Sequence, residues 1–226
     1  MKGQIIVIEG LDGSGKGTQS KKLVERLENE NFKIKHFEFP NYNSKSAWLV
    51  SEYLSGNFGK DYKDVDYRVA CISYAVDRLI TYRDEMKKYL DDGYTLICDR
   101  WVTANLLHQT TRATTKEEVD DILNWVETLE YDKFELPKPD HTFLLKVPYE
   151  YSYETAKARF KNDGSIKNDI HEASIEFLKK SYENGLYVSD KYGWDVIDCF
   201  KDNSMRSIED IHEEIYNKVI NLINKN

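Results

Sequence analysis

The pattern of apolar and polar positions along the chain predicts five strands separated by helical segments. Between the strands, apolar residues recur at every third or fourth position, which is typical of helices with one buried face. Because consecutive parallel strands need crossover connections, the pattern predicts an α/β fold with a five-stranded parallel sheet between helix layers. The predicted strands cover residues 5–8, 32–39, 95–98, 141–147 and 194–199.

The longest predicted helix covers residues 65–91. On it Tyr67, Cys71, Tyr74 and Arg78 follow one another at spacings of three or four residues, so their side chains share a face. The other predicted helices cover residues 16–30, 44–56, 101–111, 148–159 and 207–223, and two more begin at Thr115 and Ile170.

A glycine-rich stretch follows the first strand at once. Gly10 to Lys16 fit the pattern G-x-x-x-x-G-K, and a helical pattern opens after the lysine. Glycines let backbone N–H groups turn toward one point, the helix N-terminus adds a partial positive charge, and the lysine adds a full one. The context therefore predicts a phosphate-binding loop at residues 10–18. Gly17 stands where Ser or Thr normally offers a hydroxyl to magnesium, and Thr18 comes one position later.

Two further strands end in residues suited to ligand binding. Phe39 and Pro40 follow the second strand, and Asp99 and Arg100 follow the third. In open parallel sheets, ligands bind at the carboxyl ends of the strands. An acid at such an end is the usual partner of a phosphate-loop lysine and its metal ion. Taken alone, Asp99 and Arg100 could be a strand-end ion pair, and only their place beside the predicted loop favours function.

Composition narrows the class of protein. With 226 residues, the chain is most simply one domain. The net charge is −8 and both signs are interspersed, so we expect no nucleic-acid partner. Cys71, Cys98 and Cys199 are widely spaced, which favours a reducing compartment. Because we find no signal peptide and no apolar run of membrane length, we expect a cytoplasmic protein without a membrane partner.

Taken in order, these motifs resemble those of one family, the thymidylate kinases, within the nucleoside monophosphate kinases. The matching stretches are residues 9–16, 39–40, 74–78, 99–100 and 169–172. Many families share the phosphate loop, whereas the ordered combination is much more specific. The resemblance implies a P-loop NTPase fold in a single domain, residues 1–226. It also implies a monophosphate-binding region over residues 40–80 and a short lid over residues 159–170.

The resemblance implies the reaction ATP + dTMP → ADP + dTDP, assisted by Mg²⁺. In it, Lys16 and the loop amides hold the ATP phosphates, Tyr74 stacks on thymine, and Arg78 hydrogen-bonds the base. Asp99 holds magnesium through water, and Arg100 clamps the acceptor phosphate. The implied ATP-binding residues are Gly10, Asp12, Gly13, Ser14, Gly15, Lys16, Gly17 and Thr18. The implied substrate-binding residues are Asp12, Phe39, Pro40, Tyr42, Tyr74, Arg78, Arg100, Asn105, His108 and Gln109.

The lid is expected to supply a catalytic cation. Residues 160–169 form the most polar, glycine-containing stretch, which we interpret as a mobile loop that excludes water when closed. Members of the family place a catalytic arginine either in the phosphate loop or in the lid, and Ser14 excludes the first arrangement here. Arg159 is therefore the candidate, with Lys161 and Lys167 as further cations. The implied catalytic residues are Lys16, Asp99, Arg100 and Arg159, and the implied metal ligands are Asp99 and Thr18.

Departures from the family pattern leave alternatives open. Asn41 and Tyr42 stand where many members have an arginine, and Trp101, Ala104 and His108 also differ from common residues. A kinase for another nucleoside or deoxynucleoside monophosphate is therefore an alternative.

A third hypothesis is a P-loop ATPase or GTPase that acts as a switch. It lacks support, because the chain contains no N-K-x-D motif for reading a guanine base. Thymidylate kinases are commonly homodimers, and the resemblance implies that the helix over residues 65–91 serves as the dimer face.

Overall fold

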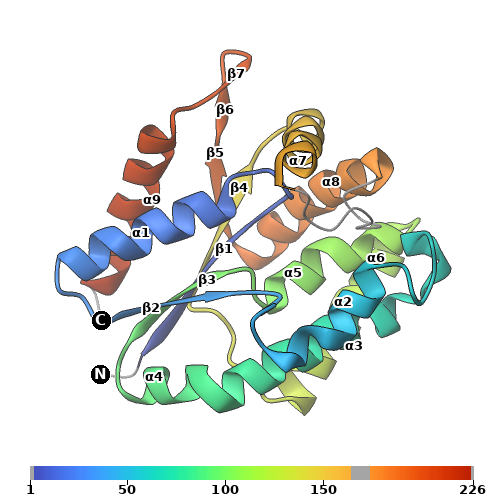
Figure 1. Cartoon of the computed structure of the whole chain (residues 1–226), viewed down its shortest axis with the longest axis horizontal. Coiled ribbons are helices and arrows are strands. Elements are labelled where there is room, and N and C mark those ends of the chain that lie inside the picture. The colour runs from blue at the N-terminus through green and yellow to red at the C-terminus, as the bar shows by residue number, and fades with distance from the viewer. Residues whose placement is uncertain (1–2, 164–173, 225–226) are drawn as a thin grey trace.

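Five parallel strands form one sheet at the centre of the molecule, as the pattern predicts (Figure 1). The computed structural model describes residues 3–163 and 174–224. The strand order is β2-β3-β1-β4-β5, so the strand before the phosphate loop is central. These strands are β1 (Gln4–Gly10), β2 (Ile34–Glu38), β3 (Thr95–Asp99), β4 (His141–Lys146) and β5 (Asp195–Asp198).

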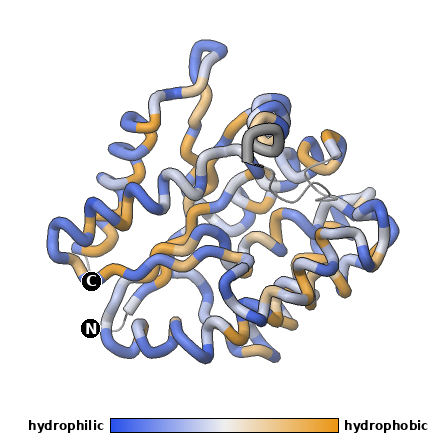
Figure 2. The backbone as a smooth tube through the Cα atoms, viewed as in Figure 1, coloured by the Kyte–Doolittle hydropathy of each residue, from blue (hydrophilic) through white to orange (hydrophobic). Residues whose placement is uncertain are grey.

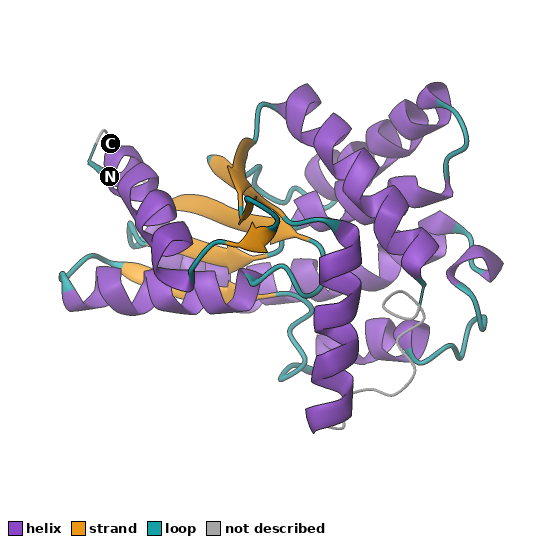
Figure 3. Ribbon diagram, turned by 90° about the horizontal axis from the view of Figure 1, so that it is seen from above, coloured by secondary structure: helices purple, strands orange, loops and turns teal. Residues whose placement is uncertain are grey.

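Helices connect the strands and cover both faces of the sheet (Figure 3). They are α1 (Lys16–Asn29), α2 (Trp48–Leu54), α3 (Tyr67–Thr81), α4 (Lys87–Asp91), α5 (Val102–His108), α6 (Lys116–Glu127), α7 (Tyr149–Asp163), α8 (Ile175–Tyr192) and α9 (Ile208–Ile223). Short 3-10 turns lie at Lys45–Ala47, Tyr62–Asp64 and Gln109–Arg112, and π-helical segments lie at Tyr82–Met86 and Thr128–Lys133.

Residues of β1 alternate between two hydrophobic clusters, because successive side chains of a strand point to opposite faces. Ile6 and Ile8 belong to a cluster that includes residues of α1 and α9. Ile5 and Val7 belong to the other cluster, which includes residues of α3, α5 and α6. Figure 2 shows the hydrophobic colour on the central strands and, alternating with hydrophilic positions, along the helices. The sheet is therefore buried on both faces, as its continuous apolar runs require.

The predicted start of the lid loop at Phe160 is wrong. Helix α7 continues to Asp163, because no glycine or proline interrupts the chain before Gly164. The remainder of the predicted lid, residues 164–170, lies outside the described residues. The helix predicted from Ile170 begins, within the described part, at Ile175 with Ser174 as its N-cap.

The long helix predicted over residues 65–91 is present as a run of three segments. Asp66 caps the start of α3, a π-helical segment follows at Tyr82–Met86, and α4 completes the run. A second π-helical segment, Thr128–Lys133, continues α6. The periodicity of the sequence did not predict either segment, because a π turn adds a residue without changing the residue types. The antiparallel hairpin of β6 (Phe200–Lys201) and β7 (Ser204–Met205) was also missed, because two-residue strands leave no pattern.

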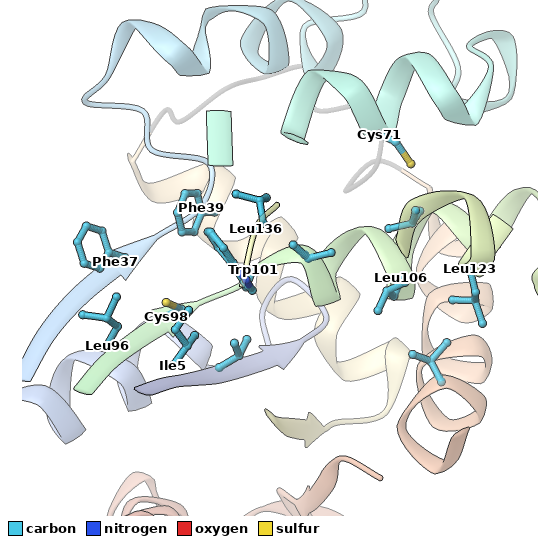
Figure 4. Packing of buried hydrophobic residues seen from close by; sticks show 14 of the residues in the cluster. Ile5, Phe37, Phe39, Cys71, Leu96, Cys98, Trp101, Leu106, Leu123 and Leu136 are labelled. Atoms are coloured by element: carbon cyan, nitrogen blue, oxygen red, sulfur yellow. The ribbon is translucent and has the colours of Figure 1, made fainter. Parts of the chain in front are cut away.

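Two aromatic residues hold the ends of β2 and β3 together (Figure 4). Phe39 follows β2 and Trp101 lies two residues beyond β3, with ring centroids 5.1 Å apart. The Phe39 N–H donates to the Asp99 carbonyl oxygen at 3.0 Å, and the Phe39–Pro40 peptide is cis. The segments that carry Pro40 and Arg100 therefore lie side by side next to the phosphate loop.

The cysteines Cys71, Cys98 and Cys199 are buried free thiols. None of the helices in residues 3–163 and 174–224 has the length and hydropathy needed to cross a membrane.

Candidate active site

The phosphate loop joins β1 to α1 and requires glycine at two positions. Gly13 and Gly15 have φ angles of +81° and +91°, in the left-handed region that favours glycine. A Cβ on Gly13 would also lie 2.6 Å from the backbone oxygen of Ser152 on α7. Gly15 is the N-cap of α1, so the unpaired N–H groups of that helix begin at the loop. The loop and helix together form a site for an anion.

Lys16 is the cation of this loop and is 6% exposed. Its Nζ donates to the Leu11 carbonyl oxygen at 2.8 Å and lies 3.8 Å from Asp12 Oδ1. Burial and the neighbouring Arg100 lower the pKa of the Lys16 ammonium, although Asp12 opposes them. The lysine is therefore a desolvated cation that an added anion would stabilise.

Arg100 connects the phosphate loop to the residues after β3. One terminal nitrogen, Nη2, donates to Asp12 Oδ1, and the other, Nη1, lies 3.4 Å from His108 Nε2. The His108 ring stacks on Phe177 with centroids 5.8 Å apart, and its Nδ1 lies 3.3 Å from Ser181 Oγ. The guanidinium is thus held between the loop and α5 while keeping a fork geometry suited to a phosphate.

Glu9 supports the turn that presents Arg100. Arg100 has a φ angle of 70°, which is unusual for a residue with a Cβ. The buried Glu9 Oε1 accepts hydrogen bonds from the Trp101 N–H at 3.3 Å and from Thr103 Oγ1 at 2.6 Å. Burial raises the pKa of Glu9, and Arg100 opposes that rise. Glu9 therefore fixes the backbone directly after Arg100.

Asp99 ends β3 beside the loop and is 6% exposed. Its carboxylate forms no hydrogen bond within the described part of the chain. Burial raises its pKa, against the opposing charges of Lys16 and Arg100. A Cβ on Gly17 would lie 3.2 Å from Asp99 Oδ2, so glycine allows α1 to approach this carboxylate closely.

The site consists of two adjoining cavities. We name them the phosphate cavity and the inner cavity. Asp12, Phe39, Pro40, Tyr74 and Arg100 line both. The phosphate cavity is also lined by Gly13, Gly15, Lys16, Gly17, Thr18, Lys21, Glu38, Tyr42, Leu54, Asp99 and Thr155. The inner cavity is also lined by Arg78, Ala104, Asn105, His108 and Gln109.

A buried ion pair lies beside the inner cavity. Arg78 Nε and Nη2 donate to Glu130 Oε2 and Oε1, both at 2.7 Å. The two side chains are 1% and 0% exposed. Burial disfavours the charged form of Arg78, but Glu130 outweighs it, so the pKa of Arg78 is raised. Asn105 Nδ2 also donates to Glu130 Oε1, at 2.7 Å.

The structure gathers almost all predicted site residues around these cavities. Tyr42 is half exposed and lines only the phosphate cavity. Gly10 and Ser14 belong to the loop but line neither cavity. Arg159 lies on α7, and its side chain is outside the described residues.

Sequence reasoning gave no role to Glu130, although a signal was present. Val119, Leu123 and Val126 form the buried face of α6, and Glu130 falls four residues further on that face. Because a buried carboxylate is normally paired with a cation, a core-facing acid predicts a buried basic partner. Arg78 lies on the buried face of α3.

The arrangement defines a class of protein. A phosphate loop on a parallel sheet, opening into a second cavity through a shared arginine, is what a P-loop nucleoside monophosphate kinase needs. Comparisons with known proteins agree, since the family model for thymidylate kinase matches residues 8–215.

Curated relatives give the same result. The chain is 32% identical to a thymidylate kinase of Plasmodium falciparum (isolate 3D7), over 96% of this chain and 90% of the relative. It is 28% identical to a probable thymidylate kinase of Pyrococcus abyssi, over 95% of each. It is 30% identical to a thymidylate kinase of Mycobacterium tuberculosis, over 78% of this chain and 81% of the relative.

The chain belongs to the thymidylate kinase family. It is an ATP-dependent kinase that phosphorylates dTMP, and the P-loop switch hypothesis is thereby set aside.

The residues present fit a magnesium ion bound mainly through substrate. Within residues 3–163 and 174–224, no three His, Cys, Asp or Glu side chains converge as a metal site. Mg²⁺ is usually held by one or two carboxylates, water and substrate phosphates. Asp99 faces the phosphate cavity as a hard oxygen donor, and Thr18 is exposed at the same cavity.

Proposed function

We propose that dTMP occupies the inner cavity, that the ATP phosphates lie on the phosphate loop, and that transfer takes place where the cavities meet. The observation that supports this proposal is the shared lining by Asp12, Tyr74 and Arg100. Phosphoryl transfer requires the donor and acceptor phosphates to be aligned at one point. The junction of the two cavities is such a point.

Lys16 and Arg100 are proposed to offset the charge of the reaction. The terminal P–O bond of ATP breaks as a bond forms from an oxygen of the dTMP phosphate, giving ADP and dTDP. The attacking oxygen is already anionic, so a general base is not required. Two mutually repelling phosphates instead need cations between them. Lys16 would hold the ATP phosphates and Arg100 the acceptor phosphate.

Magnesium is proposed to be held by Asp99 through water, with Thr18 as a weaker candidate. When bound, the ion would neutralise charge on the ATP phosphates. Gly17 leaves room for this carboxylate beside the first turn of α1.

The inner cavity is proposed to bind the base and sugar. Tyr74 packs edge-to-face on Tyr53, with centroids 6.1 Å apart, and its ring would stack on thymine. Arg78 and Asn105 would hydrogen-bond the base, with Gln109 and His108 completing the wall. Phe39, Pro40 and Tyr42 would contact the sugar and phosphate.

Arg159 is proposed as the catalytic cation of a lid over residues 159–170. Thr155 lies one helical turn before it on α7 and lines the phosphate cavity. The position of Thr155 at this cavity, on the helix that also carries Arg159, supports the proposal.

We further propose a homodimer and a cytoplasmic location. Val69, Ile72 and Ile80 are exposed on α3, at 46%, 39% and 37%. They recur along the helix as an apolar stripe that a second copy could cover. The buried free thiols of Cys71, Cys98 and Cys199 suit a reducing compartment.

The proposal is tested by following ADP formation from ATP and magnesium with dTMP, dUMP, UMP, dCMP, dGMP, dAMP, AMP or no acceptor. We expect dTMP to be preferred. Arg100→Met should lose the acceptor-dependent rate, whereas Arg68→Met, which changes an exposed arginine of α3, should keep it. ADP formation that does not depend on the acceptor would refute the proposal.

A further inference from the structure

Both groups proposed to read the base are held by one carboxylate that takes no part in phosphoryl transfer. Arg78 and Asn105 donate to Glu130, which is fully buried. We propose that Glu130 is a positioning residue that sets the hydrogen-bond polarity of the inner cavity, so that the cavity accepts thymine and uracil and rejects cytosine. This inference rests on the placement of the base proposed above.

Glu130 fixes the orientation of the Arg78 guanidinium. The bonds from Arg78 Nε and Nη2 approach one carboxylate side-on, which fixes the plane of the guanidinium. The remaining nitrogen, Nη1, forms no hydrogen bond among the described residues. Because an arginine carries only donors, Arg78 can offer the cavity nothing but N–H groups.

Glu130 next fixes the orientation of the Asn105 amide. One end of this amide lies 2.7 Å from Glu130 Oε1 and 3.2 Å from the Cys71 carbonyl oxygen. Both neighbours are acceptors, so this end must be the NH₂ group. The acceptor atom, Oδ1, therefore points the other way.

Arg112 fixes the orientation of the Gln109 amide, which is hydrogen-bonded to Asn105. Arg112 Nη1 lies 2.6 Å from Gln109 Oε1, and since arginine only donates, this atom of Gln109 is the acceptor. Gln109 Nε2 then faces Asn105 Oδ1 at 3.3 Å. Every hydrogen bond from Arg112 through Gln109 and Asn105 to Glu130 therefore has its direction fixed.

This arrangement of donors and acceptors complements thymine and uracil but not cytosine. Thymine and uracil present an acceptor at O4 and a donor at N3–H, whereas cytosine presents a donor at N4 and an acceptor at N3. A cavity with the donor of Arg78 and the acceptor of Asn105 complements the first pair. Against cytosine, donor would face donor and acceptor would face acceptor, leaving buried polar groups unpaired.

Glu130→Gln breaks this arrangement with almost no change of shape. One carboxylate oxygen becomes an NH₂ group. At the Oε2 position it faces Arg78 Nε, and at the Oε1 position it faces both Arg78 Nη2 and Asn105 Nδ2. Either placement displaces a group that reads the base. The expected consequence is a loss of discrimination rather than a uniform loss of affinity.

The test is the ratio of dissociation constants for dCMP and dUMP, measured by calorimetry without ATP. The two ligands have the same sugar and size but opposite base edges. We expect the wild-type protein to favour dUMP by about 100-fold or more, and Glu130→Gln to reduce that ratio by at least about tenfold. A partly unfolded sample changes the apparent stoichiometry and leaves each dissociation constant unaltered, so the ratio is insensitive to misfolding.

Glu127→Gln is the matched control. It makes the same chemical change three residues earlier, at a carboxylate whose Oε2 accepts from Tyr192 OH at 3.1 Å. It should keep the wild-type ratio. A wild-type protein without preference, or a Glu130→Gln variant with the ratio of Glu127→Gln, would overturn the inference. Because the measurement needs no phosphoryl transfer, it still decides the role of Glu130 if the kinase assay fails.

Discussion

One buried carboxylate lies beside each cavity, and the two carboxylates differ in their partners. Beside the inner cavity, Arg78 and Glu130 neutralise each other at 1% and 0% exposure, and Asn105 joins them by a hydrogen bond. Beside the phosphate cavity, the carboxylate of Asp99 has no hydrogen-bond partner within the described residues. Glu9 Oε2, near the end of β1, and Ser14 Oγ, in the phosphate loop, are also buried without a partner in that part of the chain.

The pKa shifts of Arg78, beside the inner cavity, and of Asp99 and Lys16, at the phosphate cavity, also differ. The pKa of Arg78 is raised because Glu130 outweighs the effect of burial, so its charged form is favoured. Burial raises the pKa of Asp99 and lowers that of Lys16, so both are shifted away from their charged forms. The ion pair beside the inner cavity is therefore arranged before any ligand binds, whereas the phosphate cavity contains charges that the proposed phosphates and their ion would stabilise.

The largest expected effect comes from breaking the inner pair. Arg78→Met leaves the Glu130 carboxylate buried without its cation. Breaking a buried pair in this way costs about 3–5 kcal/mol, which corresponds to a fall in Tm of about 6–20 °C for a chain of this length. Thermal denaturation followed by circular dichroism measures it.

The control for this change lies on the same helix. Arg68 pairs with Asp66 at 3.2 Å, and both are about half exposed, so Arg68→Met should cost less than about 1 kcal/mol. Equal stability of Arg78→Met and Arg68→Met would show that the inner pair contributes nothing.

The phosphate cavity should show a large effect on activity instead. Lys16→Ala removes the cation that we propose holds the ATP phosphates, and the loss of such a group reduces kcat by about 100-fold to 1000-fold. Stability without ligand should not fall, because a desolvated cation is removed. Lys21→Ala, which removes an exposed lysine of the same cavity, should change kcat by less than about tenfold. A Lys16→Ala variant as active as Lys21→Ala would contradict the assignment.

A smaller effect is expected in the dependence of stability on pH. Because the pKa of Asp99 is raised in the folded state, its contribution to stability is present at low pH and is lost as pH rises through that pKa. Asp99→Asn does not ionise. The free energy of unfolding of Asp99→Asn, minus that of the wild-type protein, should therefore increase from pH 4 to pH 7. A difference that is flat or shrinks with pH would show that Asp99 is not penalised by its surroundings.

The sequence predicted the fold, the phosphate loop and most residues that line the inner cavity, but not the carboxylate behind that cavity. The phosphate loop is local, since its glycines and Lys16 lie in one short stretch whose chemistry is set by spacing. The pair of Arg78 and Glu130 joins positions 52 residues apart, and only the packing of two helices brings them together. The helical spacing from Val126 to Glu130 shows that the acid lies on the buried face, but it does not show which cation it meets.

Other residues were missed for related reasons. Glu9 belongs to the recognised motif, yet its contacts with Trp101 and Thr103 depend on the neighbouring strand β3. The predicted helix over residues 148–159 ended too early. No glycine or proline occurs between residue 159 and Gly164, and α7 continues to Asp163.

Urea denaturation of Glu130→Gln and Asp99→Asn without ligand at pH 7 tests the contrast between the cavities most directly. Both variants change one buried carboxylate to a carboxamide of the same shape. We expect Glu130→Gln to lose at least about 1 kcal/mol of unfolding free energy, because at least one donor of Arg78 loses its acceptor. We expect Asp99→Asn to be more stable than the wild-type protein. A shift of both variants in the same direction would contradict the account.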